Sequence, residues 1–259
     1  MQKISIVYIT LNAEKYLLES LNQTKKLTND ILIVDSGSTD DTVKIAHSTG
    51  ARVITQDWPG FALQKQFAID NALYDSVLFL DADEILTDDA ISAVKEHLPM
   101  LSSGEVSALS FRRKNYFQGK WICHGSWWPD RVTRLVNRQS GHIKQVAVHE
   151  SWEAIGKTIS LDVDLIHHSY RSYSELIQKA DRYSSLAAEQ LLKDGKSYSN
   201  WAPLVHGVAA FFRLFVLKRG FKDGIEGAAI AMTSGLASFM KYAKLQELKL
   251  NSDRNKDLT

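Results

Sequence analysis

Cysteine is almost absent from this chain of 259 residues, and neither sign of charge predominates in it. Cys123 is the only cysteine, so an intramolecular disulfide is excluded, which fits a reducing compartment such as the cytoplasm. The 31 basic and 30 acidic residues leave a formal net charge of +1, which excludes a generally basic nucleic-acid-binding protein. A glycine-rich phosphate loop, which nucleotidyl transferases usually have, does not follow the first apolar segment.

Long apolar runs are missing as well. The segment 201–217 comes nearest, but it is shorter than the roughly 20 residues of a spanning helix and contains Arg213. The apolar N-terminal stretch has no small-residue cleavage site, so we expect a core strand there and not a signal peptide. The length predicts one large domain, or one domain with an extension.

Residues 77–83, Val-Leu-Phe-Leu-Asp-Ala-Asp, are the most informative segment. The continuous apolar run predicts a buried parallel strand, and Asp81 and Asp83 follow it directly. Ligands of open α/β sheets bind beyond the carboxyl ends of such strands. Two carboxylates at this place favour a divalent cation, Mg²⁺ or Mn²⁺, that bridges them to phosphates. A polar loop in which Asp83 or Glu84 starts a turn is the alternative.

Segments typical of strands and helices alternate through the first eighty residues. This alternation predicts an α/β fold with a parallel sheet, in which Asp35 and Asp81 emerge at the same edge. We expect strands at 4–10, 31–35, 52–55 and 77–80, and helices after the first two strands and at 61–73.

Three motifs in this region resemble the nucleotide-binding half of family 2 glycosyltransferases, which have the GT-A fold. They are residues 6–14, residues 34–40 (Val-Asp-Ser-Gly-Ser-Thr-Asp) and Asp81-Ala82-Asp83. The resemblance implies a Rossmann-like, mostly parallel sheet flanked by helices. It also implies that Thr10, Glu14 and Asp35 line a uridine pocket, that Asp81 reaches ribose or metal, and that Asp83 coordinates the metal. Many relatives have a second Asp where this chain has Ser36, which leaves the base and ribose contacts open.

The second half resembles bacterial lipopolysaccharide-core glycosyltransferases, and within them the β-1,4-glucosyltransferases that add glucose to inner-core heptose. The matching segments are 127–130 (Trp-Trp-Pro-Asp), Arg134-Leu135, 148–150 (Val-His-Glu) and 167–172. The likeness extends nearly to Lys249 and implies an inverting transferase with a UDP-sugar donor and a divalent metal.

Inverting transfer needs a base for the acceptor hydroxyl and a positive charge for the diphosphate leaving group. Glu150 is our candidate base, since the matching carboxylate of relatives has that role, and Asp130 is the second choice. Arg134 could bind the diphosphate, because a planar guanidinium suits phosphate oxygens, or it could be an ordinary strand residue. Lys65 matches a sugar-nucleotide contact, with an exposed helical lysine as the alternative, and His167 is a possible further metal ligand.

The C-terminal part is a different kind of sequence, with a helix expected from about Tyr173 to Gly195 and two apolar segments after it. Residues 201–249 hold seven basic and three acidic residues. Apolar helices edged by Lys and Arg favour an anionic membrane surface, while a lid or a dimer contact is the alternative. We expect the polar tail from Asn251 to be disordered.

We therefore expect a GT-A domain at residues 1–172 and a helical extension at 173–259 that associates with the membrane surface. The predicted activity is transfer of a hexose, with glucose implied by the resemblance, from a UDP-sugar to a heptose of the lipopolysaccharide inner core. The expected location is cytoplasmic, on the inner face of the cytoplasmic membrane, without a nucleic-acid partner. The alternatives are a UDP-sugar transferase for another lipid-linked or cell-surface glycan, and an inactive GT-A scaffold.

Overall fold

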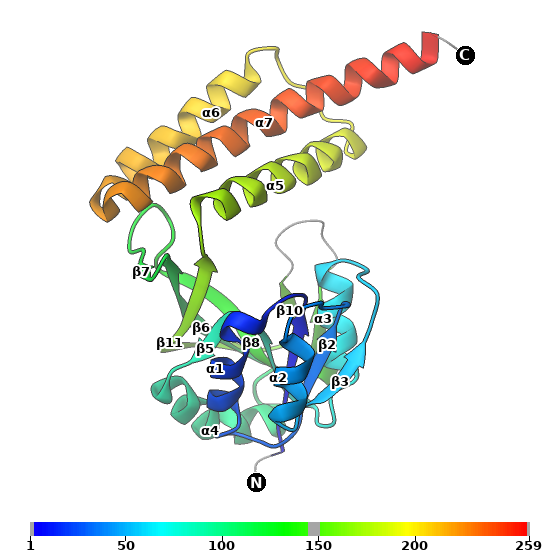
Figure 1. Ribbon diagram of the computed structural model, residues 1–259, viewed down its shortest axis with the longest axis vertical. Helices are drawn as coiled ribbons and strands as arrows, with labels where there is room; N and C mark the ends of the chain where they lie inside the picture. The colour runs from blue at the N-terminus through cyan, green and yellow to red at the C-terminus, as the bar shows by residue number, and fades with distance from the viewer. Residues whose placement is uncertain (1–2, 145–150, 258–259) are drawn as a thin grey trace. The chain divides into compact units, whose positions relative to one another are not determined.

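The computed structural model describes residues 3–144 and 151–257. The chain forms two compact units, one from residues 1–114 and 129–168 and the other from residues 115–128 and 169–259 (Figure 1). The second unit therefore includes a short internal segment in addition to the C-terminal part of the chain.

The first unit contains four parallel strands that run in the order β3-β2-β1-β4. They are β1 (Ser5–Thr10), β2 (Ile31–Asp35), β3 (Arg52–Thr55) and β4 (Ser76–Asp81). The register pairs Thr10 with Asp35, so the carboxyl ends of the first two strands lie side by side.

Antiparallel strands continue the sheet beyond β4 in the order β8-β6-β11-β5. Their bounds are β5 (Glu84–Leu86), β6 (Ala108–Phe117), β8 (Asp130–Asn137) and β11 (Thr158–Tyr170), and β7 (Lys120–Trp121) pairs with β6. A 3₁₀ turn (Arg138–Ser140) follows β8, and β9 (Gly141–Ile143) and β10 (Trp152–Ala154) form a separate pair.

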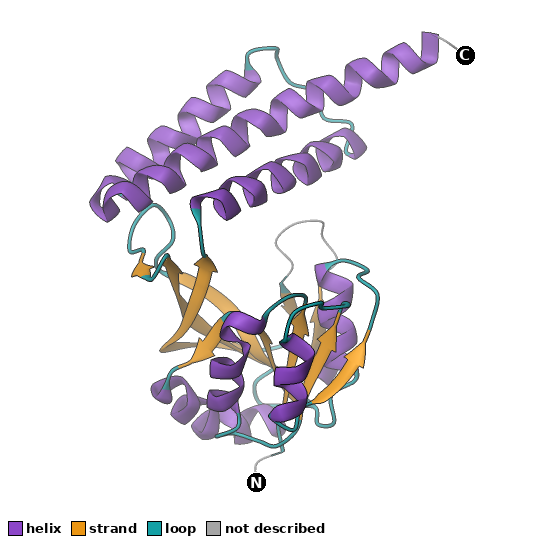
Figure 2. Cartoon of the chain, viewed as in Figure 1, coloured by secondary structure: helices purple, strands orange, loops and turns teal. Residues whose placement is uncertain are grey.

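Helices cover both faces of the parallel strands (Figure 2), which explains why the interior residues of β1, β2 and β4 are apolar, while the edge strand β3 is only partly buried. Ile6 and Tyr8 pack with α1 (Glu14–Thr24), α2 (Thr42–Ser48) and α4 (Asp88–Ser102). The alternate residues Val7 and Ile9 pack with α3 (Phe61–Asp70). Because successive side chains of a strand point to opposite faces, one strand serves both cores.

The second unit is mainly helical. Its helices are α5 (Tyr173–Lys193), α6 (Ala202–Phe212) and α7 (Gly224–Asp257), with a π-helical turn (Arg213–Leu217) and a 3₁₀ turn (Gly220–Asp223) before α7. Ser172 caps α5 by accepting a hydrogen bond from the Glu175 amide at 3.0 Å. A small core joins Phe117, Ile122, Leu176 and Ile230.

The predicted α/β class with C-terminal helices is confirmed. Two element ends were wrong, because α3 stops at Asp70 and α7 continues through residue 257, where we expected a disordered tail. Among the described residues, no helix is both long enough and apolar enough to cross a membrane.

Candidate active site

The carboxyl ends of β1 and β2 hold Thr10 and Asp35 together, two residues that the family resemblance assigns to one pocket. The Thr10 hydroxyl donates to one Asp35 oxygen at 2.8 Å, and the amides of Gly37 and Ser38 donate to the other at 3.0 and 2.8 Å. Gly37 has φ +88°, a conformation that favours glycine, so the chain can turn around the carboxylate. Asp35 is thus buried and shapes the loop that follows it.

Glu14 lies at the start of α1, where it is exposed, and it contacts the same loop. Its carboxylate accepts the Asp41 amide at 3.0 Å, while the Asn12 side chain accepts the Thr39 amide at 2.9 Å. The loops after β1 and β2 are therefore tied together, and the predicted nucleoside residues are neighbours.

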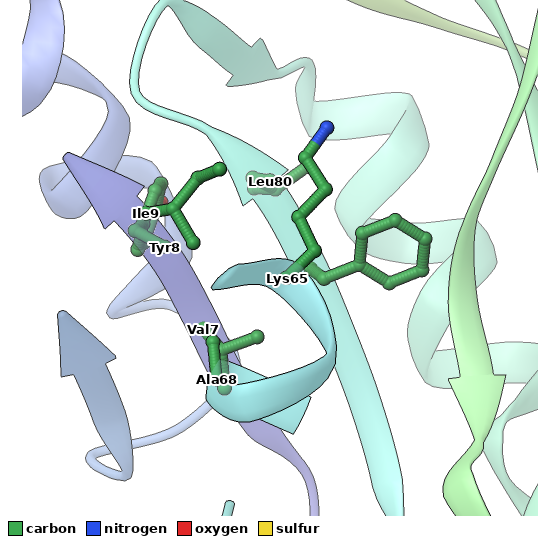
Figure 3. A pocket seen from close by; sticks show the side chains of 7 residues that line it. Val7, Tyr8, Ile9, Lys65, Ala68 and Leu80 are labelled. Carbon is green, nitrogen blue, oxygen red and sulfur yellow. The ribbon is translucent and has the colours of Figure 1, made fainter. Parts of the chain in front are cut away.

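Lys65 is buried on α3 and forms an ion pair with Asp81, with 2.9 Å between Nζ and Oδ1. The alternative of an exposed helical lysine was therefore wrong. Figure 3 shows the side chain extending beside Leu80, with its amine directed away from Val7 and Ala68. The space around the stem, between α3 and strands β1 and β4, is too small to admit a ligand.

Arg134, on β8, is also buried and binds two carboxylates. Its Nη2 donates to Asp81 Oδ2 at 2.7 Å, and its Nε and Nη2 donate to the two oxygens of Glu84 at 2.7 Å each. Glu84 in turn accepts from Arg113 Nη1 at 3.2 Å, and Arg113 Nε donates to Asp130 at 2.9 Å. Lys65 and these residues form one chain of alternating charges, which we name the carboxylate–arginine network: Lys65, Asp81, Arg134, Glu84, Arg113 and Asp130.

Burial and neighbouring charges shift the pKa values of the network residues in opposite directions. Burial alone would raise the pKa of Asp81, but Lys65 and Arg134 hold it well below the usual range. Burial likewise opposes ionisation of Glu84, and Arg134 and Arg113 keep its pKa below the ordinary value against repulsion from Asp81. For Arg113, burial lowers the pKa, and the attractions of Glu84 and Asp130 together more than offset it. Asp81, Glu84 and Arg113 are therefore held in their ionised forms at neutral pH.

A β-bulge places Arg134 in the network. The β6–β8 register pairs Leu109 with Leu135 and Ser110 with Thr133, so Arg134 is an extra residue in β8. Pairing of β8 with β4 ends at Leu135, next to this position. Bulges re-aim side chains, and this one points a guanidinium at the carboxylates that follow β4.

Asp83 lies outside the network, in the turn between β4 and β5. It is partly exposed, and its Oδ1 lies 3.6 Å from Nε2 of His167. Among the described residues, no three His, Cys, Asp or Glu side chains converge as a complete metal site. The Asp83 carboxylate still suits Mg²⁺ or Mn²⁺, because such ions prefer oxygen ligands and take the others from phosphates and water, whereas the His167 imidazole suits these ions less well.

The candidate base Glu150 and its neighbour His149 lie outside the described residues. Asp130, the second choice, is held by Arg113 at the start of β8. Sequence reasoning missed Glu84 and Arg113. Glu84 directly follows the Asp-x-Asp motif, and this adjacency was the only sequence signal for it.

Comparison with known proteins identifies the family of this chain. The model of glycosyl transferase family 2 matches residues 5–152, more than half of the chain. The chain belongs to this family. Its match contains β1, β2 and β4, the Asp-x-Asp motif and the network.

Relatives are similar over nearly the whole chain. An uncharacterised glycosyltransferase of Rickettsia typhi is 31% identical over 97% of this chain and 89% of its own length. A lipopolysaccharide core biosynthesis glycosyltransferase, LpsC of Rhizobium meliloti, is 29% identical over 94% of this chain and 92% of its own.

Solved structures share the fold. Residues 1–349 of Staphylococcus aureus TarS superpose with a TM-score of 0.50 at 14% identity, covering 94% of this chain and 92% of that one. Glucosyl-3-phosphoglycerate synthase of Mycobacterium tuberculosis also reaches 0.50, at 18% identity, covering 76% and 82%. At these identities the likeness concerns the fold alone.

Proposed function

We propose that the chain transfers a hexose with inversion from a UDP-sugar to a lipopolysaccharide-core acceptor. The observation that carries the proposal is the placement of Asp83 beside a balanced charge network, in a chain of glycosyltransferase family 2. The TarS structure was solved in complex with UDP-GlcNAc, which supports a UDP-sugar donor. LpsC, by its name, acts in lipopolysaccharide core biosynthesis, which supports the acceptor class.

The charge of the network argues for a divalent metal. Three cations, Lys65, Arg113 and Arg134, face three anions, so little positive charge is left over for a diphosphate. Asp83 and His167 would hold the ion, which would supply charge to the leaving UDP. Asp81 is already bound by two cations, so we assign it to positioning Lys65 and Arg134 beside the diphosphate.

The remaining residues divide between donor and acceptor. Thr10, Glu14 and Asp35 surround the loop that we propose to bind the uridine. Glu150 is the proposed base, because Asp130 is held in hydrogen bonds by Arg113. Glucose as the sugar and heptose as the acceptor follow from the family resemblance, and the enzyme would work on the cytoplasmic side, at the inner face of the membrane.

The test is UDP release from a panel of UDP- and GDP-sugars by the purified protein, with Mn²⁺ or Mg²⁺ and with chelator. Nucleotide-sugar binding is followed in the same samples. We expect one UDP-sugar to be turned over only with metal, and Asp83→Asn to lose about 10²-fold or more of this activity. Asp89→Asn, an exposed carboxylate on α4, is the control. Metal-independent turnover, or equal losses in both variants, would refute the proposed metal role.

Addition of a heptose-containing core acceptor then separates the acceptor classes. Accelerated UDP release and a new glycosidic product are expected with this acceptor. Acceleration by a different lipid-linked glycan alone would favour the other transferase assignment, and absence of donor binding would favour an inactive scaffold.

A further inference from the structure

The second unit carries an unusual amount of apolar surface on one side of α6 and α7, which pack side by side (Figure 1). Six side chains, between 50 and 64% exposed, recur at helical spacing along the two helices. We call them the apolar face: Leu204, Val205, Val208, Phe212, Met232 and Leu236. Single exposed apolar residues are common, but four of these side chains line one groove, and a grouped patch of this kind marks an interaction surface.

A groove of about 430 Å³ runs between the two helices in this face. Two glycines allow the helices to approach closely beneath it. A Cβ atom on Gly207 would lie 3.0 Å from Cβ of Phe239, and one on Gly235 would lie 3.0 Å from the carbonyl oxygen of Gly207. Leu204, Val208, Met232 and Leu236 contribute to its walls, so the groove suits an apolar occupant.

Basic residues border the face at the turn between the helices. Arg213, Lys218, Arg219 and Lys222 are all exposed, and residues 201–222 contain no Asp or Glu. The next two acids are already engaged within this unit. Asp223 is buried and binds His124, and Glu226 pairs with Lys120 at 2.7 Å.

We propose that the apolar face and its basic border dock on a bilayer of anionic phospholipids. Apolar side chains enter the boundary between headgroups and acyl chains, and the four basic residues meet the lipid phosphates. Anionic lipid phosphates complement the charge of this border, and self-association through the apolar face is the alternative that the test below separates. The inference deepens the membrane location proposed above by naming the surface and the lipid chemistry.

Binding of the full chain to lipid vesicles tests the role of the basic border. The probes are vesicles of phosphatidylcholine alone and with about one-third phosphatidylglycerol. We expect binding to the anionic vesicles, and a weakening of about 25-fold in Lys218→Gln/Lys222→Gln, from about five-fold per basic residue. Lys193→Gln/Lys196→Gln removes the same charge from exposed positions outside the face and should bind like the parent.

A second pair of variants tests the apolar face. Val208→Glu/Met232→Glu should weaken vesicle binding about 100-fold or more, because two apolar side chains can no longer be buried. Leu73→Glu/Ile177→Glu introduces the same charges at exposed apolar positions elsewhere and is the matched control. Circular dichroism and UDP release should be unchanged in all four variants, which separates this proposal from the proposed transferase activity.

Three results would overturn the proposal. Equal binding to neutral and anionic vesicles would show that the basic border does not contribute to binding. Equal losses in test and control variants would place the membrane contact elsewhere on the chain. A parent protein that ignores vesicles but forms dimers abolished by Val208→Glu/Met232→Glu would make the face a contact between copies.

Discussion

Glu84→Gln tests whether the carboxylate–arginine network supports the first unit. The Glu84 side chain has no exposed surface, and it accepts two hydrogen bonds from Arg134 and one from Arg113. Removing one partner of a buried ion pair costs about 3–5 kcal/mol. Glutamine keeps one acceptor oxygen, and Asp81 and Asp130 still neutralise the arginines, so we expect about 3 kcal/mol. For a domain of this size, that lowers the Tm by about 6–12 °C.

Thermal unfolding at neutral pH, followed by circular dichroism, measures this loss. Asp162→Asn is the matched control, because Asp162 pairs with Arg131 at the surface, where its side chain is 77% exposed. Exposed pairs contribute about 0–1 kcal/mol, so the control should unfold within about 4 °C of the parent. A Glu84→Gln protein that also unfolds within about 4 °C of the parent would show that the network does not stabilise the fold.

Three further outcomes follow from the same chain. Glu150→Gln should reduce transfer to acceptor by about 10²–10⁴-fold with donor binding unchanged. Glu153→Gln changes an exposed carboxylate three residues further along the sequence and should keep the parent rate, and equal losses in the two variants would contradict the base role. The depressed pKa values of Asp81 and Glu84 stabilise the protein at pH values above their unfolded pKa values of about 4, and this stability is lost as pH falls further. The Tm, measured as the pH is lowered, should therefore fall less steeply in Glu84→Gln than in the parent. Equal slopes in the two proteins would argue against this contribution of Glu84. Gly227→Ala would put a Cβ 2.0 Å from a backbone carbonyl oxygen. The resulting strain of about 1–3 kcal/mol should lower the Tm of the helical unit. An unchanged Tm would mean that the backbone shifts to accept the methyl group without cost.

The parallel strands and their edge could be predicted because the signal is local. Residues 31–35 form a strand with the predicted bounds, since an apolar run buried on both faces ends at a polar turn. The short edge strand at 52–55 also has the predicted bounds, although it is only partly buried. The grouping of Thr10 with Asp35 came from the family resemblance instead, and the two side chains are hydrogen-bonded. The end of α3 was harder to predict because Leu73 continues the apolar pattern but is mostly exposed, beyond the helix.

Arg134 shows why the rest of the site could not be read from the sequence. In a regular strand, Val132 and Leu135 would face opposite sides, because side chains alternate. Both instead pack against the same core, and residues 134–136 are buried in succession. The extra residue that the bulge inserts at Arg134 accounts for both facts, and it depends on the register with β6, which is set by long-range pairing. Strand periodicity in the sequence assigns Arg134 to one face of the sheet, but it cannot reveal that a bulge adds a residue at this position. For this reason the contacts of Arg134 with Asp81 and Glu84 could not be predicted from the sequence.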